Sequence, residues 1–173
     1  MSKAFTKDDD TGAPQFVRSR TPLPRGVPNY VTPRGLAALR DERHRLEAER
    51  SRWETAGDTA AAGAVSARMV ELDARIGSAL VVPPPAGEAR DTVRFGAAVV
   101  VVRQGQAEGE RRYQIVGVDE ADAASGRIAF TAPLARALLG RHAGDTAQVD
   151  TLLGQEEEVW LIRSIAYESP DPG

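Results

Sequence analysis

Thr131-Ala-Pro-Leu-Ala-Arg-Ala-Leu-Leu-Gly140 is the stretch that decides the fold of the C-terminal half, because it predicts one short helix within a run of strand-like segments. Pro133 suits the first position of a helix, where its missing N–H group costs nothing, and Gly140 suits the position after a helix, where a positive φ is favoured. Arg136 would point away from the apolar stripe. The stripe consists of three leucines, Leu134, Leu138 and Leu139.

The segments on either side of this helix alternate apolar and polar residues as β-strands do. Glycines at positions 105 and 109 separate the first two segments, as a hairpin loop would, and Gly154 separates the last two. The sequence therefore predicts an α+β fold, with an antiparallel sheet of about five strands and one short helix. The predicted strands are residues 93–102, 112–118, 127–131, 146–151 and 158–167.

Two amphipathic helices are predicted before this domain. Thr32 and Pro33 form a helix start, with threonine as the N-cap and proline as the first residue. The turn residues 57–59 interrupt the pattern, which predicts an antiparallel hairpin with Leu46 packed against Leu72 across the seam. The apolar positions are Leu36, Leu39, Leu46 and Trp53 in the first helix and Val65, Met69, Leu72 and Ile76 in the second.

Polar and proline-rich segments divide the chain into parts. The first 30 residues contain prolines and acidic residues without periodicity, and three prolines follow Val82. We expect a disordered or extended tail at 1–30, a helical hairpin arm at 31–81, a proline-rich linker at 82–90, the C-terminal domain at 91–168 and a second tail at 169–173.

Composition excludes several classes of protein. A net charge of −3 and an isoelectric point near 5.5 argue against a nucleic-acid binder held by a global positive field. The absence of cysteine excludes disulfides and thiolate metal sites. No apolar run approaches the roughly 20 residues that span a bilayer, and the first ten residues lack the apolar core of a signal peptide. We therefore expect a cytoplasmic protein with no membrane partner.

The sequence shows no self-contained catalytic site. His44 and His142 lack the spacing of a metal site or a catalytic triad, and there is no glycine-rich phosphate loop. We therefore expect that the chain is not an enzyme and binds no cofactor or metal of its own. We also expect it to be a monomer. Such a protein could still lend groups to another enzyme's active site.

Two further motifs accompany the stretch 131–140: Ile115-Val-Gly-Val-Asp-Glu120, and Asn29-Tyr-Val-Thr-Pro33 followed by Gly35 and Leu36. Together they resemble the Gre transcript-cleavage factors, which bind bacterial RNA polymerase. The resemblance implies a coiled-coil arm that enters the polymerase secondary channel and an FKBP-like C-terminal domain. It also implies docking on the channel rim of the largest polymerase subunit through the matched positions Asp119, Glu120, Pro133, Leu134, Ala135 and Arg136.

In that family, acidic residues at the arm tip help to hold a second Mg²⁺ that activates water for cleavage of backtracked RNA. The family's tip reads Gly-Asp-Leu-x-Glu-Asn, whereas residues 57–62 here read Gly-Asp-Thr-Ala-Ala-Ala. Asp58 matches the first acid and is the tip candidate, acting only through the polymerase Mg²⁺, and Ala61 replaces the second. The structural alternative is that Asp58 is the N-cap of the second helix.

The other candidates also have structural interpretations. Arg43 and Arg50 could guide the RNA 3′ end, but interleaved acidic residues favour ion pairs on the helix surface. The docking positions could instead pack the short helix or form a solvated turn. Ala132 stands where the family has a serine N-cap, and Thr131 could serve instead.

Two functions follow from the resemblance. The first helix is about 24 residues, or roughly 36 Å, long. It is shorter than the arm helices of the Gre factors, and in this it resembles the regulator of nucleoside diphosphate kinase group, which has a shortened hairpin. We therefore expect a factor that occupies the secondary channel and modulates elongation or initiation without strong transcript cleavage. The alternative is a transcript-cleavage elongation factor that rescues backtracked polymerase through Asp58. A peptidyl-prolyl isomerase is disfavoured, because few aromatic residues could line its pocket.

Overall fold

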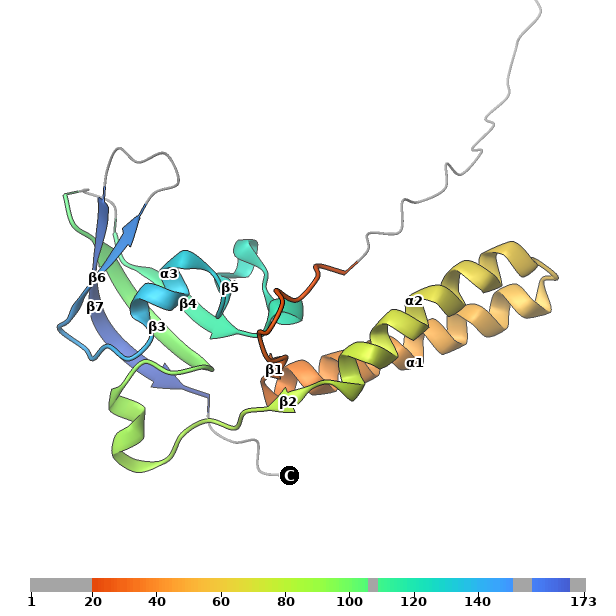
Figure 1. Ribbon diagram of the computed structural model, residues 1–173, viewed down its shortest axis with the longest axis horizontal. Coiled ribbons are helices and arrows are strands. Elements are labelled where there is room, and N and C mark those ends of the chain that lie inside the picture. The colour runs from red at the N-terminus through yellow and green to blue at the C-terminus, as the bar shows by residue number, and fades with distance from the viewer. Residues whose placement is uncertain (1–19, 106–108, 151–156, 169–173) are drawn as a thin grey trace, which may run out of the picture.

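The computed structural model describes residues 20–105, 109–150 and 157–168, which form a helical arm and a β domain. In Figure 1 the arm extends away from one end of the curled sheet. No helix in these ranges is long and apolar enough to cross a membrane. The predicted turn at Gly154, most of the first predicted tail and the second tail lie outside the described residues.

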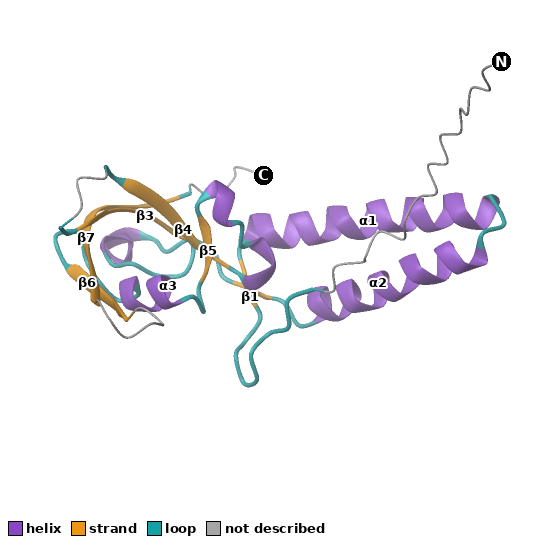
Figure 2. Cartoon of the chain, turned by 90° about the horizontal axis from the view of Figure 1, so that it is seen from above, coloured by secondary structure: helices purple, strands orange, loops and turns teal. Residues whose placement is uncertain are grey.

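The arm is an antiparallel pair of helices, α1 (Pro33–Thr55) and α2 (Thr59–Gly77), which lie side by side in Figure 2. The predicted start of α1 is confirmed, because the Thr32 hydroxyl oxygen accepts a hydrogen bond from the Gly35 N–H group at 2.9 Å. The chain turns at Gly57, whose φ of +76° favours glycine. The short connection confirms the predicted hairpin.

An apolar seam holds the two helices together. Leu46 and Leu72 are 3% and 0% exposed and belong to one cluster, which confirms the predicted seam. Trp53, predicted on the same stripe, is 37% exposed, because it lies in the last turn of α1, where α2 begins with small residues. The buried members of the seam are Val31, Leu39, Leu46, Val65, Met69 and Leu72.

The base of the arm is closed by a parallel ladder that is too short to leave a pattern in the sequence. β1 (Tyr30–Val31) pairs with β2 (Leu80–Val81), so the segments that enter and leave the arm are hydrogen-bonded to each other. Asn29 is buried beside them, and its side-chain amide donates to the Arg75 carbonyl and the Ser78 hydroxyl at the end of α2. The packed part of the chain therefore reaches back into the segment expected to be an extended tail.

The β domain is built on one five-stranded sheet in the order β5-β4-β3-β7-β6. The α+β class and the number of strands are confirmed, but the expected antiparallel pairing is wrong for one pair. β5 lies parallel to β4, because two 3₁₀ turns, η2 (Val118–Glu120) and η3 (Ala123–Ser125), carry the chain back before β5 begins. The strands are β3 (Ala97–Arg103), β4 (Arg111–Val116), β5 (Arg127–Ala129), β6 (Thr146–Asp150) and β7 (Glu157–Tyr167).

The stretch 131–140 forms the predicted short helix, α3 (Pro133–Leu138), which packs on the sheet. Gly140 follows it with a φ of +81°, which confirms the predicted end. Thr131 does not cap the helix, since no side chain accepts a hydrogen bond from its first turn. The core that α3 covers contains its own Ala135 and Leu138 together with Val99, Val101, Ile115, Trp160 and Ile162 of the sheet.

Replacing Leu72 with alanine is expected to destabilise the arm by about 2–4 kcal/mol, because it leaves a cavity in a fully buried seam. The free energy of unfolding is measured in denaturant by far-ultraviolet circular dichroism, which reports mainly the helices. Val70→Ala on the same helix is the control, since Val70 is 70% exposed and should change stability by less than about 0.5 kcal/mol. Equal effects of the two substitutions would show that the seam does not hold the arm together.

Candidate functional site

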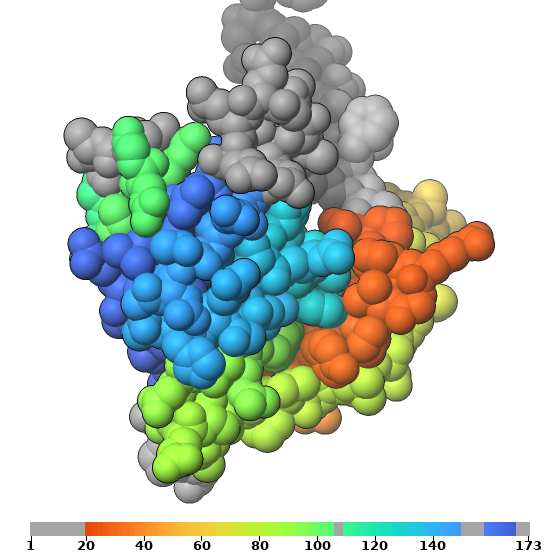
Figure 3. Space-filling view, turned by 60° about the vertical axis from the view of Figure 1, so that its left-hand side comes forward, coloured from red at the N-terminus to blue at the C-terminus, as the bar shows by residue number. Residues whose placement is uncertain are grey.

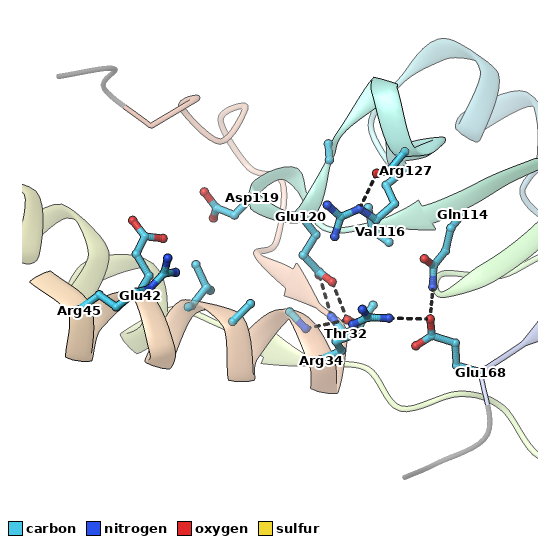
Figure 4. A pocket seen from close by; sticks show the side chains of 15 residues that line it. Thr32, Arg34, Glu42, Arg45, Gln114, Val116, Asp119, Glu120, Arg127 and Glu168 are labelled. Atoms are coloured by element: carbon cyan, nitrogen blue, oxygen red, sulfur yellow. Dashed lines mark hydrogen bonds and ion pairs between the residues drawn. The ribbon is translucent and has the colours of Figure 1, made fainter. Parts of the chain in front are cut away.

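The arm and the β domain meet at a joint centred on Glu120, which lies in the turn η2 (Figure 4). Its carboxylate accepts hydrogen bonds from the Thr32 N–H group at 2.9 Å, the Thr32 hydroxyl at 2.5 Å and the Gly117 N–H group at 3.2 Å. Thr32 is the N-cap of α1, where unpaired N–H groups and the helix dipole favour a negative charge. Glu120 therefore fastens the first turn of the arm to the domain.

Two glycines let the arm and the domain approach each other this closely. A Cβ atom at Gly35 would overlap the Glu120 carboxyl group, and one at Gly117 would lie 2.5 Å from the Tyr30 carbonyl oxygen. Gly35 lies within α1, where glycine costs about 0.5–1 kcal/mol relative to alanine. The contact with Glu120 explains why a residue without a side chain is needed there.

Asp119 forms a second polar contact of the joint, and its side chain is 4% exposed. Oδ1 accepts a hydrogen bond from Arg20 Nη1 at 3.1 Å, and Oδ2 lies 3.5 Å from Arg75 Nε in the last turn of α2. Arg20 also reaches Glu42 on α1, with 2.5 Å between Nη2 and Oε2. Burial lowers the pKa of Arg20, but its contacts with Glu42 and Asp119 together raise that pKa by more, so Arg20 stays charged. Asp119 is therefore a buried charge neutralised by two arginines.

Three aromatic rings form the apolar side of the joint. The Tyr30 ring centroid lies 5.8 Å from that of Phe95 and 5.5 Å from that of Phe130, and the two phenylalanine centroids are 5.7 Å apart. Tilted and edge-on rings at such separations attract one another beyond the effect of buried area alone. Because Tyr30 belongs to the base of the arm and both phenylalanines to the domain, the rings add an apolar contact between the two parts.

The structure changes the roles expected for the candidate docking residues. Asp119 and Glu120 are half-buried, and their carboxylates bind the arm, so their docking role stays a prediction. Ala135 is completely buried between α3 and the sheet and offers no surface to a partner, which corrects the docking role expected for it. Pro133 and Arg136 are exposed and Leu134 is half-buried, so these three stay candidates for docking. A carboxylate in a turn after a strand gives the same sequence pattern in either role.

Sequence reasoning missed Arg20 and Gly35 as parts of the joint. Arg20 lies in a segment without periodicity, which gives no signal of a long-range ion pair. Gly35 could have been found, because a glycine within a helix is costly and marks a position with a packing reason.

The tip of the arm is capped by Asp58. Its Oδ1 atom accepts a hydrogen bond from the Ala61 N–H group at 2.9 Å, and its own N–H group donates to the Trp53 carbonyl at 3.0 Å. The prediction that Asp58 is the N-cap of α2 is therefore confirmed. Ala61 has a methyl group at the position where the resemblance implies a second acid, and the described residues contain no cluster of three or more His, Cys, Asp or Glu side chains that could hold a metal ion.

The two arginines considered as RNA-facing are paired within the arm. Arg43 donates to Asp73 at 2.9 Å and to Glu47 at 3.1 Å, and Arg50 Nε lies 3.3 Å from a Glu54 carboxylate oxygen. These contacts agree with the ion-pair interpretation of the interleaved charges. Either arginine would have to leave its carboxylate partners to guide RNA.

A cleft of about 550 Å³ lies between α1 and the domain, beside the joint (Figure 4). Most of its charged side chains are already paired. Arg34 and Gln114 both donate to Glu168, at 3.5 and 3.2 Å, and Arg127 donates to Asp122 at 3.4 Å. Acidic and basic side chains are mixed along the walls of the cleft, so the lining does not indicate whether a ligand would be anionic or cationic.

Replacing Gly35 with alanine is expected to push the Glu120 carboxylate away from Thr32 and to destabilise the protein by about 1–3 kcal/mol, the cost of buried polar groups left unpaired. Gly63→Ala is the matched control. Gly63 lies within α2 with open space around it, so alanine there should stabilise the protein by up to about 1 kcal/mol. Thermal unfolding should move in opposite directions for the two variants, and a stabilised Gly35→Ala would contradict the role of the joint.

Known proteins resemble this chain over most of its length. Residues 85–167 match the family model described as transcription elongation factor GreA/GreB, C-terminal. Transcription elongation factor GreA of Methylobacterium nodulans is 37% identical over 139 residues, which cover 70% of this chain and 87% of that relative. GreB of Neisseria meningitidis serogroup B is 37% identical over 147 residues, covering 75% and 89%. A solved GreA/GreB structure from Nitrosomonas europaea is 22% identical and covers 80% of this chain and 98% of its own, with a TM-score of 0.39.

These relatives overturn one expectation. The prediction that the chain is not an enzyme is wrong, because it excluded any part in catalysis. The GreA and GreB factors stimulate the cleavage activity of RNA polymerase. The absence of a complete catalytic site in one chain does not exclude chemistry that is shared with a partner. With 37% identity to GreA over 87% of that relative's length, this chain belongs to the Gre family of transcription elongation factors.

Proposed function

We propose that this chain binds RNA polymerase, extends its arm into the secondary channel and modulates elongation or initiation there, with only weak stimulation of transcript cleavage. Membership of the Gre family supports the partner and the channel, because Gre factors bind RNA polymerase through its secondary channel. The geometry of the arm tip supports weak cleavage, and it is the observation that carries the proposal.

A second Mg²⁺ at the polymerase active centre needs carboxylate ligands from the tip. Hard cations are held by oxygen atoms, and two-metal phosphoryl chemistry depends on both ions. The tip of this chain offers Asp58, whose Oδ1 atom already caps α2, and has the Ala61 methyl group in place of the second acid. Glu54, in the last turn of α1, is paired with Arg50. The occupancy of a second metal ion should therefore be low.

The length of the arm supports the same function. α1 contains 23 residues, which corresponds to about 34 Å at 1.5 Å per residue. An arm of this length would occupy the channel and exclude another factor from it by mass action. The shortened arm is also the feature that resembles the regulator of nucleoside diphosphate kinase group.

The docking surface is proposed to be the exposed side of α3, in a domain of FKBP-like topology. Pro133 and Arg136 are exposed there, and Leu134 is half-buried. Arginine is enriched at protein interfaces, where it combines charge with apolar contact. We place this surface against the rim of the secondary channel in the largest polymerase subunit. The chain would act there as a monomer in the cytoplasm, with its arm reaching toward the RNA 3′ end.

The alternative function is transcript cleavage that rescues backtracked polymerase. Asp58 favours it, because a carboxylate has two oxygen atoms and the cap hydrogen bond is made by Oδ1. Close to the Mg²⁺ held by the polymerase, the other oxygen atom could bind a second ion. The two functions differ in whether one carboxylate at the tip is enough to bind the second Mg²⁺ ion and support cleavage. A direct cleavage assay distinguishes them.

Purified protein added to backtracked elongation complexes is expected to shorten the RNA much more slowly than a GreA factor does. Ala61→Glu restores the missing carboxylate and should raise the cleavage rate at least about tenfold, since even changes outside the ligand shell alter metal affinity by that factor. Ala64→Glu, at an exposed position about one turn further along α2, adds the same charge and should not raise it. Fast cleavage by the unchanged chain, abolished by Asp58→Ala, would establish the alternative function instead.

Arg136→Glu is expected to weaken binding to RNA polymerase, because reversing a charge at an interface slows association with a complementary partner. Arg163→Glu is the control, since Arg163 is also exposed but lies on β7. Surface plasmon resonance gives the association rate, and the loss should shrink at high salt, which screens the charge. Equal losses for the two variants would remove α3 from the docking surface.

A further inference from the structure

Arg20 joins the domain to the arm at a point away from the centre of the joint. Its guanidinium donates to Asp119 Oδ1 in the domain at 3.1 Å and lies 2.5 Å from Glu42 Oε2 on α1. The side chain of Arg20 is 19% exposed and that of Asp119 is 4% exposed, so the bridge is shielded from water on its domain side. Figure 3 shows the segment that begins at residue 20, in orange-red, lying against the cyan part of the domain.

The same segment is held by the second helix. Arg75, in the last turn of α2, donates from Nη2 to the Thr21 carbonyl, and its Nε atom lies 3.5 Å from Asp119 Oδ2. Residues 20 and 21 therefore contact both helices of the arm and the domain. Isolated ion pairs on a surface contribute little to stability, but this set is a network around an almost completely buried carboxylate.

The position of Glu42 makes the bridge effective against tilting. Glu120 holds α1 at its N-cap, Thr32, and a contact at one end of a helix leaves the other end free to tilt. Glu42 lies about three helical turns further on, roughly 15 Å along the axis. The tip lies about 34 Å from the base, where a tilt of roughly 10° would move it by roughly 6 Å. A restraint at Glu42 therefore controls where the tip lies.

We propose that Arg20 is a positioning residue, which ties the segment before β1 to α1 and to the domain and thereby fixes the direction of the arm. This role goes beyond the proposed function, because it belongs to a segment outside both the helices and the sheet. The positioning role of Arg20 rests on the proposed function only where it concerns the placement of the arm tip in the polymerase. Ligands and catalytic groups must be placed within about 0.5–1 Å of their productive positions, so a displacement of several ångströms there would be decisive.

The test measures the distance between arm and domain in the full chain without polymerase, so its outcome is independent of the proposed function. The chain contains no cysteine, and therefore Ala60→Cys near the tip and Ala143→Cys in the domain, both at exposed positions, give two unique sites for spin labels. Double electron–electron resonance yields the distribution of distances between the labels. The labelled chain should give one narrow distribution, and adding Arg20→Ala should broaden it or shift it by several ångströms.

Arg43→Ala is the matched control, because Arg43 is also paired with two carboxylates, Asp73 and Glu47, but both lie within the arm. It should leave the distance distribution unchanged. Arg20→Lys keeps the charge without the forked donor geometry and should broaden the distribution less than Arg20→Ala. An Arg20→Ala distribution identical to that of the labelled chain would overturn the proposal. Loss of helix in circular dichroism would also overturn it, since Arg20 would then serve folding and not direction.

Discussion

The hydrogen bonds between the Glu120 carboxylate and Thr32 are the contact on which the shape of this protein depends. The arm and the β domain have separate apolar cores, one between the two helices and one between α3 and the sheet. A core shared by both parts would set their relative orientation by close packing. Here a polar joint with aromatic rings beside it anchors the base of the arm, and the ion pairs of Arg20 add a second contact further along α1. Hydrogen bonds to an ionised acceptor are roughly twice as strong as neutral ones and are directional, so a small number of them can anchor the base of the arm.

The charges of the joint match the ends of the helices that meet there. Because the two helices are antiparallel, the N-terminus of α1 and the C-terminus of α2 lie together at the base of the arm. The positive end of the α1 dipole favours the Glu120 carboxylate, and the negative end of the α2 dipole favours Arg75. Asp119 then neutralises Arg75 from the domain. The hairpin topology and the placement of acids and bases in the joint therefore have one electrostatic explanation.

The ends of the helices could be predicted from the sequence, whereas the joint could not. Thr32, Asp58 and Gly140 act on backbone groups a few residues away, so their residue types indicate their roles directly. Glu120 acts on a residue far away in the chain, and its pattern is the same whether it faces water, a partner or the arm. A motif shared with a family does not reveal which contact it serves. Arg20 belongs to a segment without periodicity, and the parallel pairing of β4 with β5 likewise depends on turns that leave no pattern.

The ladder between β1 and β2 makes the arm a modular insertion. Because these two strands flank the hairpin and pair with each other, both ends of the arm are fixed at one place. If both helices became longer or shorter by equal amounts, the β1–β2 ladder, the joint and the domain would stay unchanged. Seven residues added to each helix would lengthen the arm by about 10 Å and keep its apolar seam in phase. The length of the arm can therefore evolve, or be engineered, in heptad steps without altering the joint or the β domain.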